Sequence, residues 1–479
     1  MKKFFALLLI LSAMNSVYGK VKLPAVFSDY MVLQQKTNAA VWGQAAPGKT
    51  IELSNTWSRK RYTVKADEAG NWKIMVATPS YGGPYAMTIS DGEPLVLMNI
   101  MIGEVWICSG QSNMEFPMSG WTKVVNAEKE IADAKYPNIR LLQVKQQNSN
   151  VPLTDVKVTH EGWTPCIPQF IPEFSAVAYF FAREIYKKTG IPIGLIHTSW
   201  GGTVIEAWTS ANTMRTMPDF AAALVKVQEA AKVDTIDYTR EKANRPTALY
   251  NAMINPFIQY SIRGAIWYQG ENNAPRAHQY RMLFPALIKD WRAQWKLGDF
   301  PFYFVQLANY ALGDGTEFAW AELRDAQLQT LILPNTGMAV TIDVGEAGDI
   351  HPKNKQDVGK RLALIALANT YGKNIAYSGP LLKSYKVLGD KIKLKFDHTD
   401  GGLVAKGGKE LTGFRIAGKD QKFYPAKAVL KGNHVELSSS DVSEPMVVRY
   451  AWANNPICNL YNGAGLPASP FTITIMPIR

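Results

Sequence analysis

The chain has 479 residues, of which 47% are hydrophobic and 19% are charged. This length exceeds that of one ordinary domain, and the composition supports a large core and excludes a long disordered chain. The formal net charge is +12, but the lysines are dispersed and no basic run is interleaved with aromatic residues. We therefore do not expect a nucleic acid partner.

The N-terminus carries the pattern of a secretory signal peptide. Lys2 and Lys3 precede a short apolar run, and the small residues Val17 and Gly19 suit the −3 and −1 cleavage positions. The run is shorter than the roughly 20 apolar residues that a membrane span needs, and no later segment approaches that length. We expect residues 1–19 to be a cleaved signal and the mature chain to be periplasmic or secreted, without a membrane span.

Residues 20–100 favour a small β-sandwich. Short alternating segments rich in β-branched residues are separated by turn signals such as Ala46-Pro47-Gly48. The expected strands are VKLPAVF, NAAVWGQ, TIELSN, KRYTVKAD, WKIMVAT and YAMTISD.

Residues 101–375 alternate between strand and helix patterns. This alternation predicts an α/β fold with a mainly parallel sheet, helices on both faces and ligands beyond the carboxyl ends of the strands. The expected strands are 103–110, 138–144, 191–200, 262–270, 302–308 and 338–344, and the expected helices are 175–190, 283–295, 320–332 and 354–372.

The β pattern returns at residues 376–479, where a second β domain is expected. Its predicted strands are KIKLKFDH, LTGFRIAG, AVLKGNHVELSS and MVVRYAW. The cysteines Cys108, Cys166 and Cys458 are odd in number and widely spaced, which argues against a disulfide framework. The sequence contains no CxxC or HxxxH spacing, so we do not predict a metal site.

A nucleophile candidate follows the strand at 103–110. In the segment from Cys108 to Met114, a small residue, Gly110, lets the chain turn before Ser112 and leaves its hydroxyl at the sheet edge. A backbone N–H after such a turn can face an oxyanion. The alternative is an ordinary strand-to-helix turn capped by a serine.

A base candidate lies before the last predicted helix of the α/β part, in the segment Gly348-Asp-Ile-His-Pro. His351 follows a strand end, and Asp349 projects to the same side two residues earlier, where it can orient the imidazole. The alternative is a helix N-terminal loop, where Asp and His are common. His197 lies within an apolar strand and is expected to be a core residue.

Two further turns follow strand ends. Tyr268-Gln-Gly-Glu-Asn-Asn273 supplies side-chain amides, and Ser199-Trp-Gly-Gly-Thr203 supplies glycines whose backbone N–H groups can approach a substrate. Together with Ser112 and His351 they form a set for acyl transfer. Such chemistry requires no metal or organic cofactor.

The segments GEVWICSGQSNM, SWGGTVIEAW, IWYQGENN and DIHPKNKQDVGKRLA, in this order, resemble the sialate O-acetylesterase family, a branch of the SGNH or GDSL hydrolases. The resemblance extends from about Lys20 to Arg479. It implies an SGNH-type three-layer catalytic domain, with Ser112 as nucleophile and His351 as base. It also implies an oxyanion hole at Ser112, Gly202 and the QGENN turn, and an O-acetylated sialic acid or related acetylated sugar as substrate.

The chain departs from the pattern of the superfamily at two positions. Most SGNH hydrolases carry Asp three residues before the histidine, where this chain has Gly348, so the third member is Asp349, Asp343 or a backbone carbonyl. The oxyanion amide is Asn273 or Asn272, with Gln269 as a further donor. The expected substrate-binding residues are Gln111, Glu271 and Arg276.

Other functions remain open. An acetylesterase for xylan or pectin would use the same motifs, whereas an arginine that cradles a sialate carboxylate, with Arg276 and Arg324 as candidates, would favour sialic acid. A glycosidase would need a second carboxylate beside Glu271. A non-catalytic carbohydrate-binding protein would use the aromatic residues of the β domains. The sequence does not determine the oligomeric state.

Overall fold

The computed structural model describes residues 20–232, 236–237, 240–311, 317–408 and 410–475. The predicted signal peptide at residues 1–19 lies outside the described residues. Across the described ranges, no helix combines the length and the apolar character that crossing a bilayer requires.

A mostly parallel sheet forms the centre of the molecule. The expectation of an α/β fold is thereby confirmed. Apart from one antiparallel edge strand, β10 (Thr164–Cys166), adjacent strands of this sheet run parallel. The parallel strands are, in sheet order, β8 (Tyr136–Gln143), β11 (Ile193–Ser199), β7 (Pro94–Gly110), β13 (Gly264–Tyr268), β14 (Phe302–Val305) and β15 (Thr336–Ala339).

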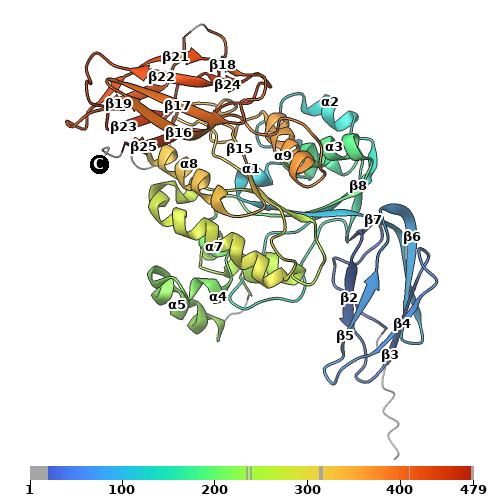
Figure 1. Ribbon diagram of the computed structural model, residues 1–479. Helices are drawn as coiled ribbons and strands as arrows, with labels where there is room; N and C mark the ends of the chain where they lie inside the picture. The colour runs from blue at the N-terminus through green and yellow to red at the C-terminus, as the bar shows by residue number, and fades with distance from the viewer. Residues whose placement is uncertain (1–19, 233–235, 238–239, 312–316, 409, 476–479) are drawn as a thin grey trace, which may run out of the picture.

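Helices cover both faces of this sheet (Figure 1). One pair, α3 (Ala176–Thr189) and α9 (Lys355–Asn369), packs together over β8, β11, β14 and β15. The other pair is α7 (Ala277–Trp295) and α8 (Ala319–Gln329). The shorter elements in the connections are α1 (Ser112–Glu115), α2 (Ala127–Ala132), α4 (Ala211–Met214), α5 (Ala221–Ala231), α6 (Arg240–Ala243), β9 (Asn148–Ser149) and β12 (Ile236–Asp237).

Alternation along the strands explains how both faces become apolar. In β14, Phe302 and Phe304 contact Phe284 of α7. The intervening Tyr303 points to the other face, where it stacks on Trp106 of β7. Because successive strand residues project to opposite sides, a continuous apolar run is the pattern of a strand covered on both faces.

Antiparallel strands precede the parallel sheet, and β7 belongs to both. Its first half pairs with β6 (Gly82–Ser90) and its second half continues into the central sheet, so the predicted boundary at residue 100 falls inside one strand. The predicted strand at 21–27 forms turns instead, since its backbone pairs only through Lys22 with Gln44. The remaining N-terminal strands are β1 (Val32–Gln34), β2 (Asn38–Gln44), β3 (Thr50–Asn55), β4 (Arg61–Lys65) and β5 (Asn71–Ala77).

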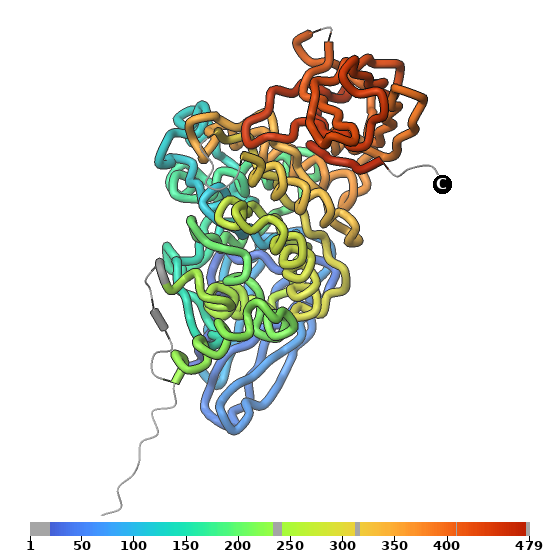
Figure 2. The backbone as a smooth tube through the Cα atoms, turned by 90° about the vertical axis from the view of Figure 1, so that its left-hand side faces the viewer, coloured from blue at the N-terminus to red at the C-terminus, as the bar shows by residue number. Residues whose placement is uncertain are grey.

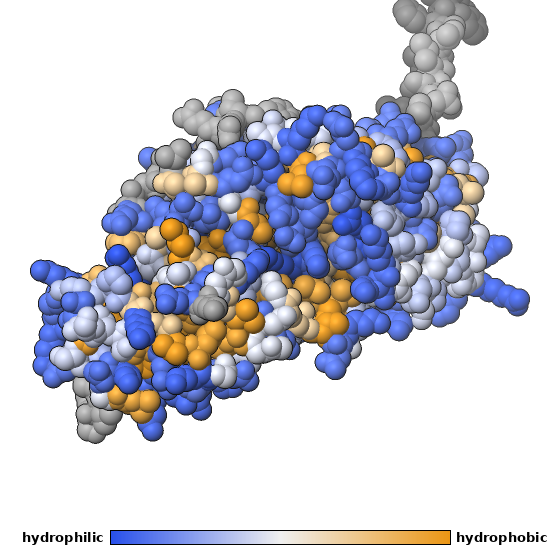
Figure 3. All heavy atoms as spheres, turned by 90° about the horizontal axis from the view of Figure 1, so that it is seen from above, coloured by the Kyte–Doolittle hydropathy of each residue, from blue (hydrophilic) through white to orange (hydrophobic). Residues whose placement is uncertain are grey.

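Further antiparallel sheets follow α9 and have a hydrophobic cluster of their own. They lie at the opposite end of the molecule from the N-terminal strands (Figures 1 and 2). Seen from this end, hydrophobic residues form separate patches among hydrophilic ones (Figure 3). The strands are β16 (Leu381–Leu388), β17 (Lys391–Asp397), β18 (Leu403–Ala405), β19 (Phe414–Ala417), β20 (Phe423–Pro425), β21 (Lys427–Lys431), β22 (His434–Ser438), β23 (Val447–Tyr450), β24 (Leu460–Asn462) and β25 (Phe471–Thr474).

Candidate active site

The serine motif lies where the chain order of the sheet reverses. β7 is flanked by β11 on one side and β13 on the other, and Ser112 follows its carboxyl end as the first residue of α1. In open α/β sheets this crevice is where ligands bind. Gly110 makes the turn possible, because its φ is +142° and a Cβ there would lie 2.1 Å from the carbonyl oxygen of Tyr268.

The structure brings Ser112 and His351 together. Ser112 Oγ lies 3.0 Å from Nε2 of His351, within hydrogen-bond distance. The His351 side chain is 28% exposed, so a substrate can reach it from solvent. Burial lowers the pKa of His351, the charge of Lys355 lowers it further and Asp349 opposes both. A neutral imidazole beside a hydroxyl is the arrangement that a general base requires.

Asp349 is positioned beside His351 through the backbone more than through the ring. Its Oδ1 accepts the backbone N–H of His351 at 2.8 Å and lies 3.7 Å from Nδ1. The other carboxylate candidate, Asp343, is occupied elsewhere. It accepts both terminal nitrogens of Arg361 at 2.6 and 2.8 Å and the hydroxyl of Tyr461 at 3.0 Å.

The glycine turn after β11 passes directly over the serine. A Cβ on Gly201 would lie 3.0 Å from the Cβ of Ser112, so no larger residue fits without displacing it. Gly202 has a φ of +73°, and among the described residues its N–H has no hydrogen-bond acceptor. The carbonyl of Gly202 accepts the amides of Asn272 and Asn244 at 2.6 and 3.0 Å, which fixes the turn.

The two amides predicted as oxyanion donors lie behind this turn. Asn273 is fully buried and its side chain bonds the Ile205 N–H at 2.9 Å and Glu206 at 3.1 Å. Gln269, also fully buried, donates to Asn273 at 2.7 Å and to the Thr203 carbonyl at 3.2 Å. Both amides bond the loop that follows Gly202, and among the described residues neither forms a hydrogen bond with Ser112.

Of the three predicted substrate-binding residues, two are buried and the third is held in an ion pair. Gln111 and Glu271 are 2% and 6% exposed, and Gln111 accepts the Gly270 N–H at 3.3 Å. Arg276 is 40% exposed but pairs with Glu206 at 2.7 Å.

The alternative arginine, Arg324, is fully buried, and all its hydrogen-bond acceptors among the described residues are backbone carbonyls, so it is not free to bind a sialate carboxylate. Its acceptors are the carbonyls of Leu307, Ala308, Ala453 and Asn454.

The structure shows a buried polar cluster next to Ser112 and His351 that the sequence did not predict. The Asn113 side chain donates to Glu271 at 2.6 Å and to the carbonyl of Ile350 at 3.0 Å, and accepts from Lys355 at 2.5 Å. Burial lowers the pKa of Lys355 to about 7 and raises that of Glu271. A lysine at the start of an amphipathic helix carries no signal that it is fully buried, but Asn113 directly follows Ser112, the predicted nucleophile, in its motif.

The structure also accounts for His197. His197 is 1% exposed, and its ring bonds Gln143 and Ser199 at 2.6 and 2.5 Å, which confirms it as a core residue.

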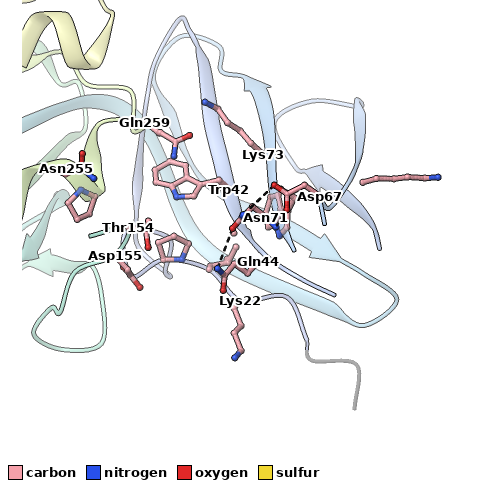
Figure 4. A pocket seen from close by; sticks show the side chains of 16 residues that line it. Lys22, Trp42, Gln44, Asp67, Asn71, Lys73, Thr154, Asp155, Asn255 and Gln259 are labelled. Atoms are coloured by element: carbon pink, nitrogen blue, oxygen red, sulfur yellow. Dashed lines mark hydrogen bonds between the residues drawn. The ribbon is translucent and has the colours of Figure 1, made fainter. Parts of the chain in front are cut away.

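A large cleft lies away from the catalytic motifs. The cleft has a volume of about 750 Å³, and none of the four motifs that follow the strand ends contributes to its lining (Figure 4). Its labelled residues come from the N-terminal strands and from segments around 154 and 255, so this cleft is not the catalytic crevice.

Comparison with known proteins agrees with this geometry. A family model described as carbohydrate esterase, sialic acid-specific acetylesterase matches residues 102–368. The sialate O-acetylesterase of Mus musculus is 30% identical over 98% of this chain and 98% of its own length. The human protein of the same name is 30% identical over 97% of this chain and 94% of its own length.

The structural comparison extends over both flanking regions. The crystal structure of a carbohydrate acetylesterase from Xanthomonas citri has a TM-score of 0.86 and 38% identity, covering 95% of this chain and 100% of that chain. The family match spans the serine and histidine motifs, and the similarity continues through the strands on either side. The chain therefore belongs to the family of sialic acid-specific acetylesterases among the carbohydrate esterases, and it is a carboxylic ester hydrolase.

Proposed function

We propose that this protein is an exported serine esterase that removes O-acetyl groups from sugars through an acetyl-enzyme intermediate. The observation that carries the proposal is the 3.0 Å contact between Ser112 and His351 at the switch point of the sheet. The names of the curated relatives and the Xanthomonas citri acetylesterase support acetylated carbohydrate as the substrate class. The signal-like pattern at residues 1–19 supports export.

In the proposed first step, Nε2 of His351 accepts the proton of Ser112 as Oγ attacks the acetyl carbonyl. The negative oxygen that forms accepts the N–H groups of Ser112, at the positive end of α1, and Gly202. His351 returns its proton to the sugar oxygen as the C–O bond breaks. Asp349 stabilises the transient imidazolium.

In the second step, water attacks the acetyl group on Ser112. His351 takes a proton from the water and then gives it to Ser112 Oγ as acetate leaves. These steps need only protein groups and water.

O-acetylated sialic acids are the first candidate substrate, because the curated relatives are named for them. Acetylated plant polysaccharides such as xylan or pectin are the second. Arg324 is buried on backbone carbonyls and Arg276 is paired with Glu206, which favours a substrate with an uncharged backbone, such as xylan. Acetate release from O-acetylated sialic acids, acetylated xylan and pectin separates these candidates.

Replacing the nucleophile tests the serine mechanism. Ser112→Ala should lower kcat/KM for acetate release by roughly 10⁴-fold or more, because no other group can carry the acyl intermediate. Fluorophosphonate should label the wild-type protein and not this variant. Ser440→Ala, which changes an exposed serine in the C-terminal sheets, is the matched control and should keep full activity and labelling.

Full activity of Ser112→Ala would overturn the assignment of the nucleophile. Cleaved glycosidic bonds without released acetate would instead support a glycosidase that uses Glu271.

A further inference from the structure

Trp121 stands apart from the other tryptophans of this protein. The chain has 13 tryptophans. All of them lie in the described ranges, and among them Trp121 is the only one that is mainly exposed, with 57% of its surface in solvent. An indole in water leaves a large apolar area unburied, so an exposed one at a site calls for a binding partner.

This exposed ring touches the catalytic histidine. The ring centroids of Trp121 and His351 are 5.4 Å apart, and those of Trp121 and Phe116 are 5.3 Å apart. Both pairs meet at 68°, so neither neighbour lies flat against the indole. The indole therefore contacts Phe116 and His351 edge-on, while much of its surface remains exposed to solvent.

The loop that carries Trp121 is held in place from both sides. At Gly120, a Cβ would lie 2.5 Å from the ring of Phe116 and 2.9 Å from the Pro117 carbonyl oxygen, which permits only glycine. Further along, the Val125 N–H donates to the Lys353 carbonyl at 3.1 Å, two residues after His351. Trp121 therefore keeps its position relative to the imidazole.

The direction of the proton transfers places the sugar on this side of the site. In acyl transfer, the leaving oxygen accepts its proton from the imidazole that took the serine proton. The sugar that carries this oxygen must lie beside His351 during acylation. The apolar surface exposed there belongs to Trp121, and the C–H face of a pyranose ring is the complementary apolar surface.

We propose that Trp121 is the stacking platform for the pyranose ring of the acetylated substrate, a proposal that rests on the proposed function. Two lysines close to Trp121 or His351 in the sequence occur in ion pairs. Lys123 lies 2.9 Å from Glu128, and Lys353 lies 3.3 Å from Glu346. The platform thus recognises the uncharged ring and leaves the acetyl group to the oxyanion donors.

The test compares two esters of acetic acid, a mono-O-acetylated methyl pyranoside and ethyl acetate, which has no ring. Trp121→Ala should lower kcat/KM for the pyranoside about tenfold, mainly through KM, and change that for ethyl acetate by less than about twofold. Trp121→Phe should recover part of the loss. Tyr81→Ala, which removes an aromatic side chain that is 48% exposed in the N-terminal strands, is the matched control.

Two results would contradict the proposal that Trp121 stacks on the sugar ring. Unchanged pyranoside kinetics in Trp121→Ala would show that the indole does not contact substrate, and equal losses on both esters would show that it only supports His351. A wild-type protein that hydrolyses ethyl acetate but no acetylated sugar would overturn the proposed function itself, and the platform with it.

Discussion

The surroundings of His351 shift the pKa of its imidazole in opposite directions. Burial and the charge of Lys355 lower its pKa, whereas Asp349 raises it. A general base works in its neutral form, which is present above its pKa and lost as the pH falls through that value. The acid limb of kcat/KM should therefore lie below the ordinary histidine value of about 6.5.

Asp349→Asn should move this limb further toward acid, because the variant removes the charge that raises the pKa of His351. It should also lower kcat by roughly 10- to 100-fold. This is less than the roughly 10⁴-fold seen where such a carboxylate is bonded directly to Nδ1, because the distance here is 3.7 Å. The pH profile of kcat/KM is the measurement, with the exposed Asp441→Asn as control. An unmoved limb would remove Asp349 from the mechanism.

At the scale of elements, Asn113 joins α1 to the loop before α9. Its amide donates to the Ile350 carbonyl, next to His351, and accepts from Lys355 at the start of α9. Lysine can only donate, and the carbonyl and Glu271 accept, so the amide can satisfy all three in one orientation. These three hydrogen bonds of Asn113 connect the helix of Ser112 to Glu271 and to the segment that carries His351.

Asn113→Ala should lower kcat at least tenfold with little change in KM, because Ser112 and His351, the proposed catalytic pair, lose their alignment. It should also lower the free energy of unfolding by roughly 1–3 kcal/mol, since buried polar groups lose their partner. Asn113→Asp should be worse, because its carboxylate would face Glu271. Steady-state kinetics and thermal unfolding measure the two effects. A destabilised variant with normal kcat would reduce Asn113 to a purely structural role.

At the scale of the whole molecule, Arg324 connects the central sheet to the C-terminal segment. It donates to the carbonyls of Leu307 and Ala308 on one side and of Ala453 and Asn454 on the other, at 2.8 to 2.9 Å. The same regions meet through Gln306 and Ser469 at 2.9 Å. A buried cation shared by backbone carbonyls holds the two parts in one arrangement.

Arg324→Met should lower the free energy of unfolding by roughly 2–4 kcal/mol, because it removes the donor of the Leu307 and Ala453 carbonyls and one of two donors of the Ala308 and Asn454 carbonyls. Arg415→Met, at an exposed position of β19, should stay within about 0.5 kcal/mol of the wild type. Denaturant unfolding measures both variants. Equal stability of the two would show that the contacts of Arg324 do not hold the C-terminal segment in place.

The local pattern of the sequence determined the alternation of strands and helices, the placing of Ser112 after a strand end and the placing of His351 in the loop before the last helix, because periodicity and turn residues are local properties. The strand predicted at 338–344 is instead β15, which ends at Ala339. Contacts between distant segments were decided by the tertiary structure. Gln269 and Asn273 share a motif with Glu271, yet their amides turn toward the loop after Gly202. Burial of Arg324 and Lys355 and exposure of Trp121 likewise depend on what packs against each side chain, which no residue's immediate neighbours reveal.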